Sequence, residues 1–292
     1  MIPIGVGAAY ARPGEVQSAY LVRAGDDAIC LDLGAGALNR LQEEIAPERL
    51  SAIVISHLHP DHCADLFSLR VYMSWGPGRG RRLRILGPPG LRERLLDFAG
   101  TDGWDDAFAF EVIEGPIGGM DVDGFRISWA EVPHSPPTFA IRVDAGGASL
   151  TYGADCAPNE ALVELARGTQ LLVAECSHGA QPLPPAPIHL SAREAGEIAT
   201  RAGARRLLLT HCYPEHDRDL ALDLARATFS GPVTWARQGE AVVASVSMMS
   251  PWTKIAYRSR PALADSAVMP PMTRAFSISS RRICPGSTRS GE

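Results

Sequence analysis

Four candidate metal ligands lie within six residues of this chain, directly after a short apolar run. The cluster reads His57-x-His59-x-Asp61-His62, and residues 52–55 before it are Ala-Ile-Val-Ile. Neutral imidazole nitrogens and carboxylate oxygens are ligands that borderline divalent metals prefer, whereas solubility requires no such clustering. The apolar run is typical of a short buried strand. The sequence therefore predicts a metal site on a loop that leaves the end of a buried strand.

The local backbone is expected to divide this cluster into two pairs. His57 and His59 can point the same way, because alternate residues of an extended chain share a face. Pro60 is expected to block a helix until the cluster has passed, with Asp61 and His62 at the opening of the helix that follows. Two pairs that face two places suggest two metal ions rather than one.

Composition favours a folded protein with a large core. The chain has 292 residues, of which 46% are hydrophobic and 21% charged, so residues 1–249 are predicted to form one domain. From Pro251 the periodicity gives way to Ser, Pro and Arg. Residues 250–292 are therefore predicted to be a flexible, disordered tail, whose role is left open.

Cysteine usage and the N-terminal sequence predict a cytoplasmic protein. The six cysteines show neither a CxxC spacing nor a paired framework, which fits a reducing compartment. Residues 1–7 lack a basic segment and a full apolar stretch, so no signal peptide is expected. No segment is long enough to span a bilayer, and no membrane partner is expected.

The charge distribution argues against a long nucleic acid as partner. The formal net charge is −5, and the tail carries seven basic and two acidic residues, which leaves a strongly acidic body. Binding a long nucleic acid requires a basic surface. A basic stretch at Arg79, Arg81, Arg82 and Arg84 is expected to be a solvated loop, while a contact with a phosphorylated substrate is left open.

Hydrophobic periodicity predicts alternating strands and helices, as in an α/β fold. Strands are expected near 17–23, 27–32, 52–55, 83–87, 108–113, 124–132, 138–143, 148–153, 170–174, 205–210, 232–236 and 241–246. Helices are expected near 37–44, 63–72, after Pro88-Pro89, and at 158–167, 192–202 and 217–228. The helix at 192–202 has the clearest ends, because Ser191 and Glu194 form a capping box and Gly203 follows its last turn.

Three further candidate ligands each follow a predicted strand. His134 lies between two prolines after the strand at 124–132, Asp155 follows the strand at 148–153, and His211 ends the strand at 205–210. Loops at the carboxyl ends of strands converge to build sites in α/β proteins. These three residues and the cluster are therefore expected to meet at one edge of the fold.

This order of residues resembles the metallo-β-lactamase superfamily, and within it the ribonuclease Z-like phosphodiesterase branch. The cluster is followed by single His, Asp and His positions, and Tyr152-Gly-Ala-Asp155 precedes a strand that ends at Glu175. His189-Leu-Ser-Ala-Arg-Glu-Ala and the later Leu-Thr-His211 are also similar to that branch. The resemblance covers roughly residues 5–246. It implies a four-layer αββα sandwich with metals at one edge.

The resemblance also implies a role for each residue of the site. One metal ion would be held by His57, His59 and His134, and a second by Asp61, His62 and His211, with Asp155 bridging the two. Zn²⁺ is the expected metal, with Mn²⁺ or Fe as alternatives from ligand type. A hydroxide that bridges the metals would attack the substrate. Asp61, His189 and Glu175 are the expected catalytic residues. His189 would face the phosphate of the substrate, and Glu175 would orient the His189 imidazole.

The expected substrate is a small phosphodiester, with a 3′,5′-cyclic nucleotide as the best guess. Ribonuclease Z grips transfer RNA with a long arm, which in that family lies between the positions of His134 and Asp155. Here that interval can hold only two strands and a turn. The alternatives are ribonuclease processing of RNA ends, a lactonase or other carboxylic ester hydrolase, and a metal-binding protein without turnover. A homodimer is left open by the resemblance, although no residue pattern shows an interface.

Overall fold

The structure is a computed structural model, and it describes residues 1–100 and 103–244. The tail predicted at 250–292 lies outside the described residues. Among the helices that the structure describes, none is long and apolar enough to cross a membrane.

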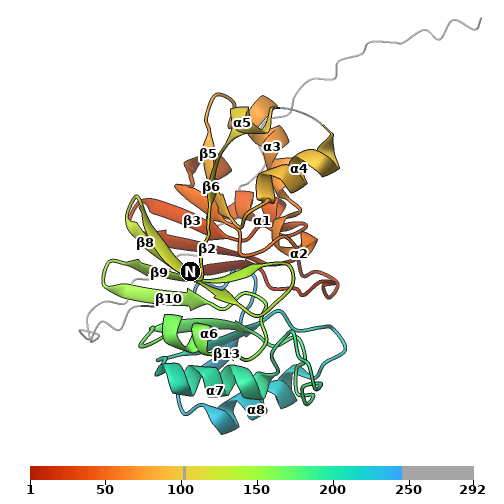
Figure 1. Ribbon diagram of the computed structural model, residues 1–292, viewed down its shortest axis with the longest axis vertical. Coiled ribbons are helices and arrows are strands. Elements are labelled where there is room, and N and C mark those ends of the chain that lie inside the picture. Colours follow the sequence, from red (N-terminus) through yellow and green to blue (C-terminus); the bar gives the residue numbers. More distant parts are fainter. Residues whose placement is uncertain (101–102, 245–292) are drawn as a thin grey trace, which may run out of the picture. The chain divides into compact units, whose positions relative to one another are not determined.

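Two mixed sheets form the centre of the fold (Figure 1). The first sheet has the order β1-β2-β3-β4-β5-β6, with β1 (Ile2–Gly5), β2 (Ala19–Ala24), β3 (Asp27–Leu31), β4 (Ala52–Val54), β5 (Leu83–Gly87) and β6 (Phe108–Val112). The second has the order β13-β12-β11-β10-β9-β8-β7. Its strands are β7 (Ile117–Val122), β8 (Phe125–Val132), β9 (Thr138–Ala145), β10 (Ala148–Tyr152), β11 (Leu171–Glu175), β12 (Leu207–Thr210) and β13 (Val233–Trp235). In the first sheet, β1 to β3 pair antiparallel and β3 to β6 pair parallel. In the second sheet, β7 to β10 pair antiparallel and β10 to β13 pair parallel.

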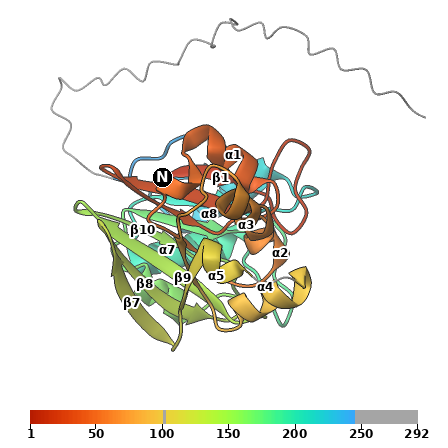
Figure 2. The ribbon, with the colours of Figure 1, turned by 90° about the horizontal axis from the view of Figure 1, so that it is seen from above.

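Helices cover the outer face of each sheet. On the first sheet lie α1 (Ala37–Glu44), α2 (Pro60–Cys63), α3 (Leu66–Trp75), α4 (Leu91–Ala99) and α5 (Trp104–Ala107). On the second lie α6 (Glu160–Leu165), α7 (Ala192–Ala202) and α8 (Arg218–Thr228). Seen from above, α3 to α5 are in front and α7 and α8 behind (Figure 2). The predicted αββα sandwich is confirmed.

Successive side chains of a strand point to opposite faces of its sheet, and they form three apolar cores: one between the two sheets and one between each sheet and its helices. In β3, Ile29 and Leu31 belong to the core between the sheets, while Cys30 faces the helices of the first sheet. In β11, Val173 faces the same central core and Leu172 faces the helices of the second sheet. Because successive strand residues point to opposite faces, strands that are buried on both sides read as continuous apolar runs.

Several predicted elements differ from the observed ones. β1, β7 and α5 are not among the predicted elements; in β7, Gly118 and Gly119 weaken the strand pattern. The helix predicted at 63–72 is two helices, α2 and α3. The strand predicted at 241–246 is wrong for its described part, because residues 241–244 form no strand. There Val242 exchanges backbone hydrogen bonds with Met1 instead.

The predicted ends of α7 are confirmed, although Glu194 accepts from the Ser191 hydroxyl instead of completing the capping box through the Ser191 amide, and the candidate ligands lie at strand ends. Ser191 is the N-cap and its side chain accepts from the Arg193 amide, while Gly203 ends the helix in the left-handed conformation. A predicted ligand follows β4, β8, β10 and β12 within three residues of each strand's last residue. The sheets therefore bring polar residues together at their carboxyl edges.

Truncation of a core residue tests the central layer. Ile127 in β8 is fully buried between the sheets, whereas Ile117 at the edge strand β7 is 78% exposed. We expect Ile127→Ala to lower the free energy of unfolding by about 2–5 kcal/mol, because a cavity replaces packed methyl groups. The matched control Ile117→Ala should change it by less than about 0.5 kcal/mol. Chemical denaturation measures both, and equal effects would contradict the layer assignment.

Candidate metal centre

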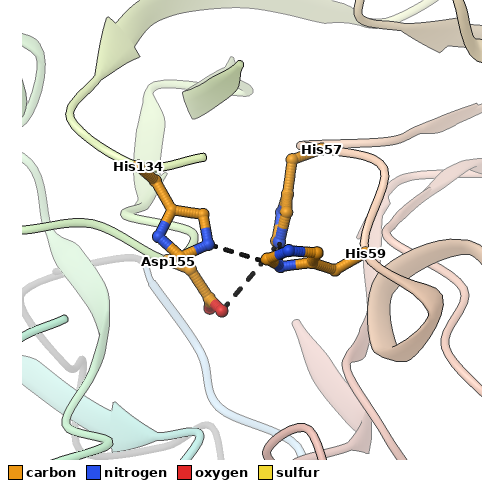
Figure 3. Close-up of side chains that lie close together, drawn as sticks. All are labelled: His57, His59, His134 and Asp155. Atoms are coloured by element: carbon orange, nitrogen blue, oxygen red, sulfur yellow. Dashed lines mark hydrogen bonds and ion pairs between the residues drawn. The ribbon is translucent and has the colours of Figure 1, made fainter. Parts of the chain in front are cut away.

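The structure brings the seven predicted metal ligands into two groups that share Asp155. The first group is His57, His59, His134 and Asp155, and the second is Asp61, His62, Asp155 and His211. Within each group the ligand atoms lie within 4.8 Å of one another. In Figure 3, the imidazoles of His57 and His59 lie opposite the imidazole of His134 and the carboxylate of Asp155, and all four point toward a common centre. The clusters are suited to two metal ions.

The loop after β4 carries four of these residues, and its path differs from the prediction in one detail. His59 has an extended backbone and is the N-cap of α2, which begins at Pro60. The expectation that Pro60 blocks a helix until the cluster has passed is wrong, because proline is well tolerated in the first turn, where its missing amide would lack a partner anyway. Asp61 and His62 then project from this turn, as expected.

Close packing by a glycine holds this loop in place. A Cβ atom at Gly34 would lie 2.0 Å from the backbone oxygen of Asp61. The Leu33 amide donates to the His62 carbonyl at 2.8 Å, and the Ser18 amide donates to the Asp61 carbonyl at 3.1 Å. The segment after β3 therefore packs directly on the backbone that presents two candidate ligands.

Direct hydrogen bonds orient two of the imidazoles. His62 Nδ1 lies 2.7 Å from Asp32 Oδ2, and His134 Nδ1 lies 3.0 Å from the carbonyl oxygen of Ile188. A carboxylate and a carbonyl can only accept, so each Nδ1 carries the proton and donates. The Nε2 lone pair of each ring is then free to face its ligand group, as in metal-binding histidines.

Two serines orient two further imidazoles in the same manner. Ser56 Oγ donates to Asp32 Oδ2 at 2.9 Å and lies 3.0 Å from His57 Nδ1. Ser177 Oγ donates to a Glu175 oxygen at 2.7 Å and lies 3.0 Å from Nδ1 of a second-group ligand, His211. A hydroxyl has one proton, so each serine that donates to a carboxylate accepts from the imidazole. Asp32 and Glu175 thus each fix one histidine through a serine.

Three non-glycine residues at this edge have a left-handed backbone. They are Asp32, Ala154 and His211, with φ of 59°, 53° and 52°. Such conformations are costly for residues with a Cβ and persist where the surroundings fix them, commonly at functional sites. All three lie directly after a strand or next to a candidate ligand. The strained backbone therefore coincides with the two ligand groups.

The chemistry of the donor atoms fits divalent cations. Asp155 Oδ1 is buried without a hydrogen-bond partner, and His62 Nε2 lies 3.3 Å from His211 Nε2. At this distance the two ring nitrogens need either a proton or a metal ion between them, because two facing lone pairs would repel each other. Buried carboxylate oxygens are normally paired or bound to metal. Nitrogen and oxygen ligands suit Zn²⁺, and the metal identity remains open.

Electrostatics keeps most of the ligands in the form that binds metal. Burial raises the pKa of Asp155, but His211 and His62 hold it well below its usual range. Burial also raises the pKa of Asp61, but hydrogen bonds from His211 and His62 outweigh burial and hold this pKa well below its usual range. Burial lowers the pKa of His57 well below its usual value, so its ring is neutral. For His62, burial lowers the pKa, and the charges of Asp155 and Asp32 raise it well above the usual value. A divalent cation would displace that proton.

His189 and Glu175, the two predicted catalytic residues outside the ligand groups, lie side by side. His189 Nδ1 lies 2.8 Å from Glu175 Oε1, and Asp155 completes a third group with them. Burial lowers the pKa of His189, but the charge and hydrogen bond of Glu175 raise it to about 9. The geometry brings together the pair that the sequence suggested, while their roles stay a prediction.

Sequence reasoning missed the residues behind the ligands. Asp32 is fully buried and accepts from the Ser56 amide at 2.7 Å and from the Tyr152 hydroxyl at 2.7 Å, in addition to His62. Neither Ser56 nor Ser177 was among the candidates. A signal existed for Asp32, because it is an acidic residue directly after β3, and Asp155 was identified as an acidic residue shortly after a strand, β10.

The basic stretch predicted as a loop is partly engaged by the protein itself. Arg84 makes a two-point ion pair with Glu111, at 2.6 and 3.0 Å, and Arg82 donates to the Phe108 carbonyl. Arg84 lies in β5, within the strand predicted at 83–87.

Removal of the Asp32 charge tests the orientation of His62. We expect Asp32→Asn to weaken zinc binding by about 10–100-fold, because the amide orients His62 and Ser56 less well. Asp26→Asn, at an exposed turn, is the matched control and should leave affinity unchanged. Competition with a chromophoric chelator measures affinity, and circular dichroism checks folding. Unchanged zinc affinity in folded Asp32→Asn would contradict the assignment.

Comparison with known proteins agrees with this geometry. Residues 28–212, more than half of the chain, match the family model described as the beta-lactamase superfamily domain. An uncharacterised protein of Mycobacterium tuberculosis is 34% identical over 251 residues, covering 79% of this chain and 86% of the relative. A ribonuclease Z of Mycobacterium bovis is 31% identical, covering 72% and 85%.

A solved structure supports the same assignment. The metallo-beta-lactamase fold protein YhfI of Bacillus subtilis superposes with a TM-score of 0.74 at 28% identity, covering 82% of this chain and 96% of that chain. Family match, fold and the two ligand groups agree, and the chain belongs to the β-lactamase superfamily, with the metallo-β-lactamase fold.

Proposed function

We propose that this protein is a metal-dependent hydrolase that cleaves a small phosphodiester, with a 3′,5′-cyclic nucleotide as the best candidate. The observation that carries the proposal is the pair of complete ligand groups around Asp155, with His189 and Glu175 adjacent to them. Ligand sets of this kind hold two ions about 3.5–4 Å apart, a spacing that suits in-line displacement at phosphorus.

In this proposal each residue of the site has a separate role in binding metal, donating a proton or orienting an imidazole. Bound divalent cations would lower the pKa of a water molecule and neutralise charge on the phosphoryl oxygens. Asp155 joins the two groups, and Asp61 with His62 and His211 fixes the second one. His189, held by Glu175, donates a proton or hydrogen bond to the phosphate or the leaving oxygen. The serines and Asp32 keep the imidazoles from rotating.

A small substrate is supported by what lies between His134 and Asp155. That interval contains β9, the Gly146-Gly147 turn and β10, which pair as an antiparallel hairpin of the second sheet. The hairpin is part of the sandwich rather than a projecting arm. We therefore favour a substrate that fits at the metal centre without a remote grip.

Ribonuclease activity is the second candidate, because a ribonuclease Z is among the relatives at 31% identity. The acidic body of the chain favours the small substrate over RNA. Lactone hydrolysis and metal binding without turnover remain the further alternatives, and the complete ligand groups argue against the latter.

A substrate panel tests the proposed function. Zinc-loaded protein should hydrolyse cyclic AMP and bis-p-nitrophenyl phosphate, and a chelator should abolish both activities, because the nucleophile depends on metal. A transfer RNA precursor and a homoserine lactone complete the panel. Cleavage of the precursor alone would promote the ribonuclease alternative. Rapid cleavage of the lactone alone would overturn the proposal.

Removal of His189 tests its role separately from metal binding. We expect His189→Ala to retain zinc and to lower kcat for cyclic AMP by about 10²–10⁴-fold, because proton donation is lost. His178→Ala is the matched control, since His178 is also a loop histidine and its ring lies 6.3 Å from that of His189. Full turnover by zinc-loaded His189→Ala would exclude the role.

A further inference from the structure

Two tyrosines form a stacked pair on loops that adjoin the metal centre. Tyr10 lies between β1 and β2, and Tyr213 lies two residues after His211. Their ring centroids are 4.8 Å apart with an interplanar angle of 28°. The two loops are joined by the backbone, because the His211 amide donates to the Val6 carbonyl at 3.1 Å.

Side-chain bonds fix this pair in place. The Tyr10 hydroxyl donates to Glu215 Oε1 at 2.7 Å, and an Arg12 guanidinium nitrogen donates to the His216 carbonyl at 2.8 Å. Arg218 makes a two-point ion pair with Glu15 at 2.8 and 2.9 Å. The hydroxyl of Tyr10 is thus engaged, and a ligand meets its ring rather than its polar end.

Part of the aromatic surface of the pair is exposed to solvent. Tyr10 is 54% exposed even though Tyr213 covers one face of its ring. Tyr213 is half-buried. The backbone hydrogen bond between His211 and Val6 brings the two loops that carry these rings together next to a candidate ligand.

We propose that Tyr10 and Tyr213 form a stacking platform for the aromatic base of a nucleotide whose phosphate lies at the metal centre. A fixed aromatic ring offers a planar base a large contact area at little conformational cost. Stacking accepts any base, because each has a π-face. This inference rests on the proposed function and narrows its substrate class to nucleotides.

Ligand binding by the zinc-loaded protein tests the platform without requiring turnover. Isothermal titration calorimetry compares AMP with ribose 5-phosphate, which carries the same phosphate and sugar but no base. We expect tighter binding of AMP by the native protein. Tyr10→Ala should weaken AMP binding by about tenfold and leave ribose 5-phosphate binding unchanged. Tyr213→Ala should act in the same direction.

Tyr72→Ala is the matched control. Tyr72 also donates its hydroxyl to a glutamate, Glu48, at 2.8 Å, but Glu48 precedes β4 and so lies toward the opposite edge of the sheet. This variant should change the binding of neither ligand. Because Tyr10 is exposed, Tyr10→Ala decides the matter even if Tyr213→Ala does not fold.

The outcomes separate the platform from the proposed function. Equal affinity of the native protein for AMP and ribose 5-phosphate, binding of neither, or an equal loss for both ligands in Tyr10→Ala would overturn the platform. If the base-dependent loss occurs but no phosphodiester is hydrolysed, the platform stands and the proposed function fails. If cyclic AMP is hydrolysed and Tyr10→Ala shows no base dependence, the function stands and the platform is wrong.

Discussion

Buried negative charge is the constraint on which this structure depends. Asp32, Asp155 and Glu175 are each at most 2% exposed, and they lie at the edge where the two sheets bring their strand ends together. An unpaired carboxylate in such a place costs several kcal/mol. Asp32 and Glu175 are satisfied by hydroxyl, amide and imidazole groups. Among the described residues, Oδ1 of Asp155 has no hydrogen-bond partner, and it lies 3.5 Å from Nε2 of both His62 and His211. That oxygen is therefore placed to accept a cation shared by the two ligand groups.

The two satisfied carboxylates have parallel roles. Each accepts directly from one histidine, His62 or His189, and reaches a second through a serine. Hydrogen bonds formed during folding therefore already orient three of the candidate ligands, His57, His62 and His211, and these imidazoles would not have to be ordered by a binding ion. Such preparation favours tight binding, because the entropy of ordering has already been lost. The shell behind the ligands is as much a part of the centre as the ligands.

The candidate ligands could be predicted from the sequence because histidine is a rare residue and several of these histidines directly follow a predicted buried strand. His57, His134 and His211 each follow a strand, and β-strands buried on both faces are visible as apolar runs. Ser56 and Ser177 could not be predicted in this way, since serine is common in loops and its role depends on neighbours distant in sequence. β7 escaped prediction because glycine hides strand periodicity. The pairing of Tyr10 with Tyr213 depends on two loops about 200 residues apart, which no local pattern reports.

The contact of Gly34 with the carbonyl of Asp61 has a consequence for the history of this chain. A methyl group at position 34 would have to displace the turn from which Asp61 and His62 project. Selection for metal binding would therefore remove substitutions of Gly34, although glycine has no side chain that could take part in the chemistry. A glycine at this position in a distant homologue would indicate the same path of the α2 turn. A larger residue would indicate that the second ion is held differently or has been lost.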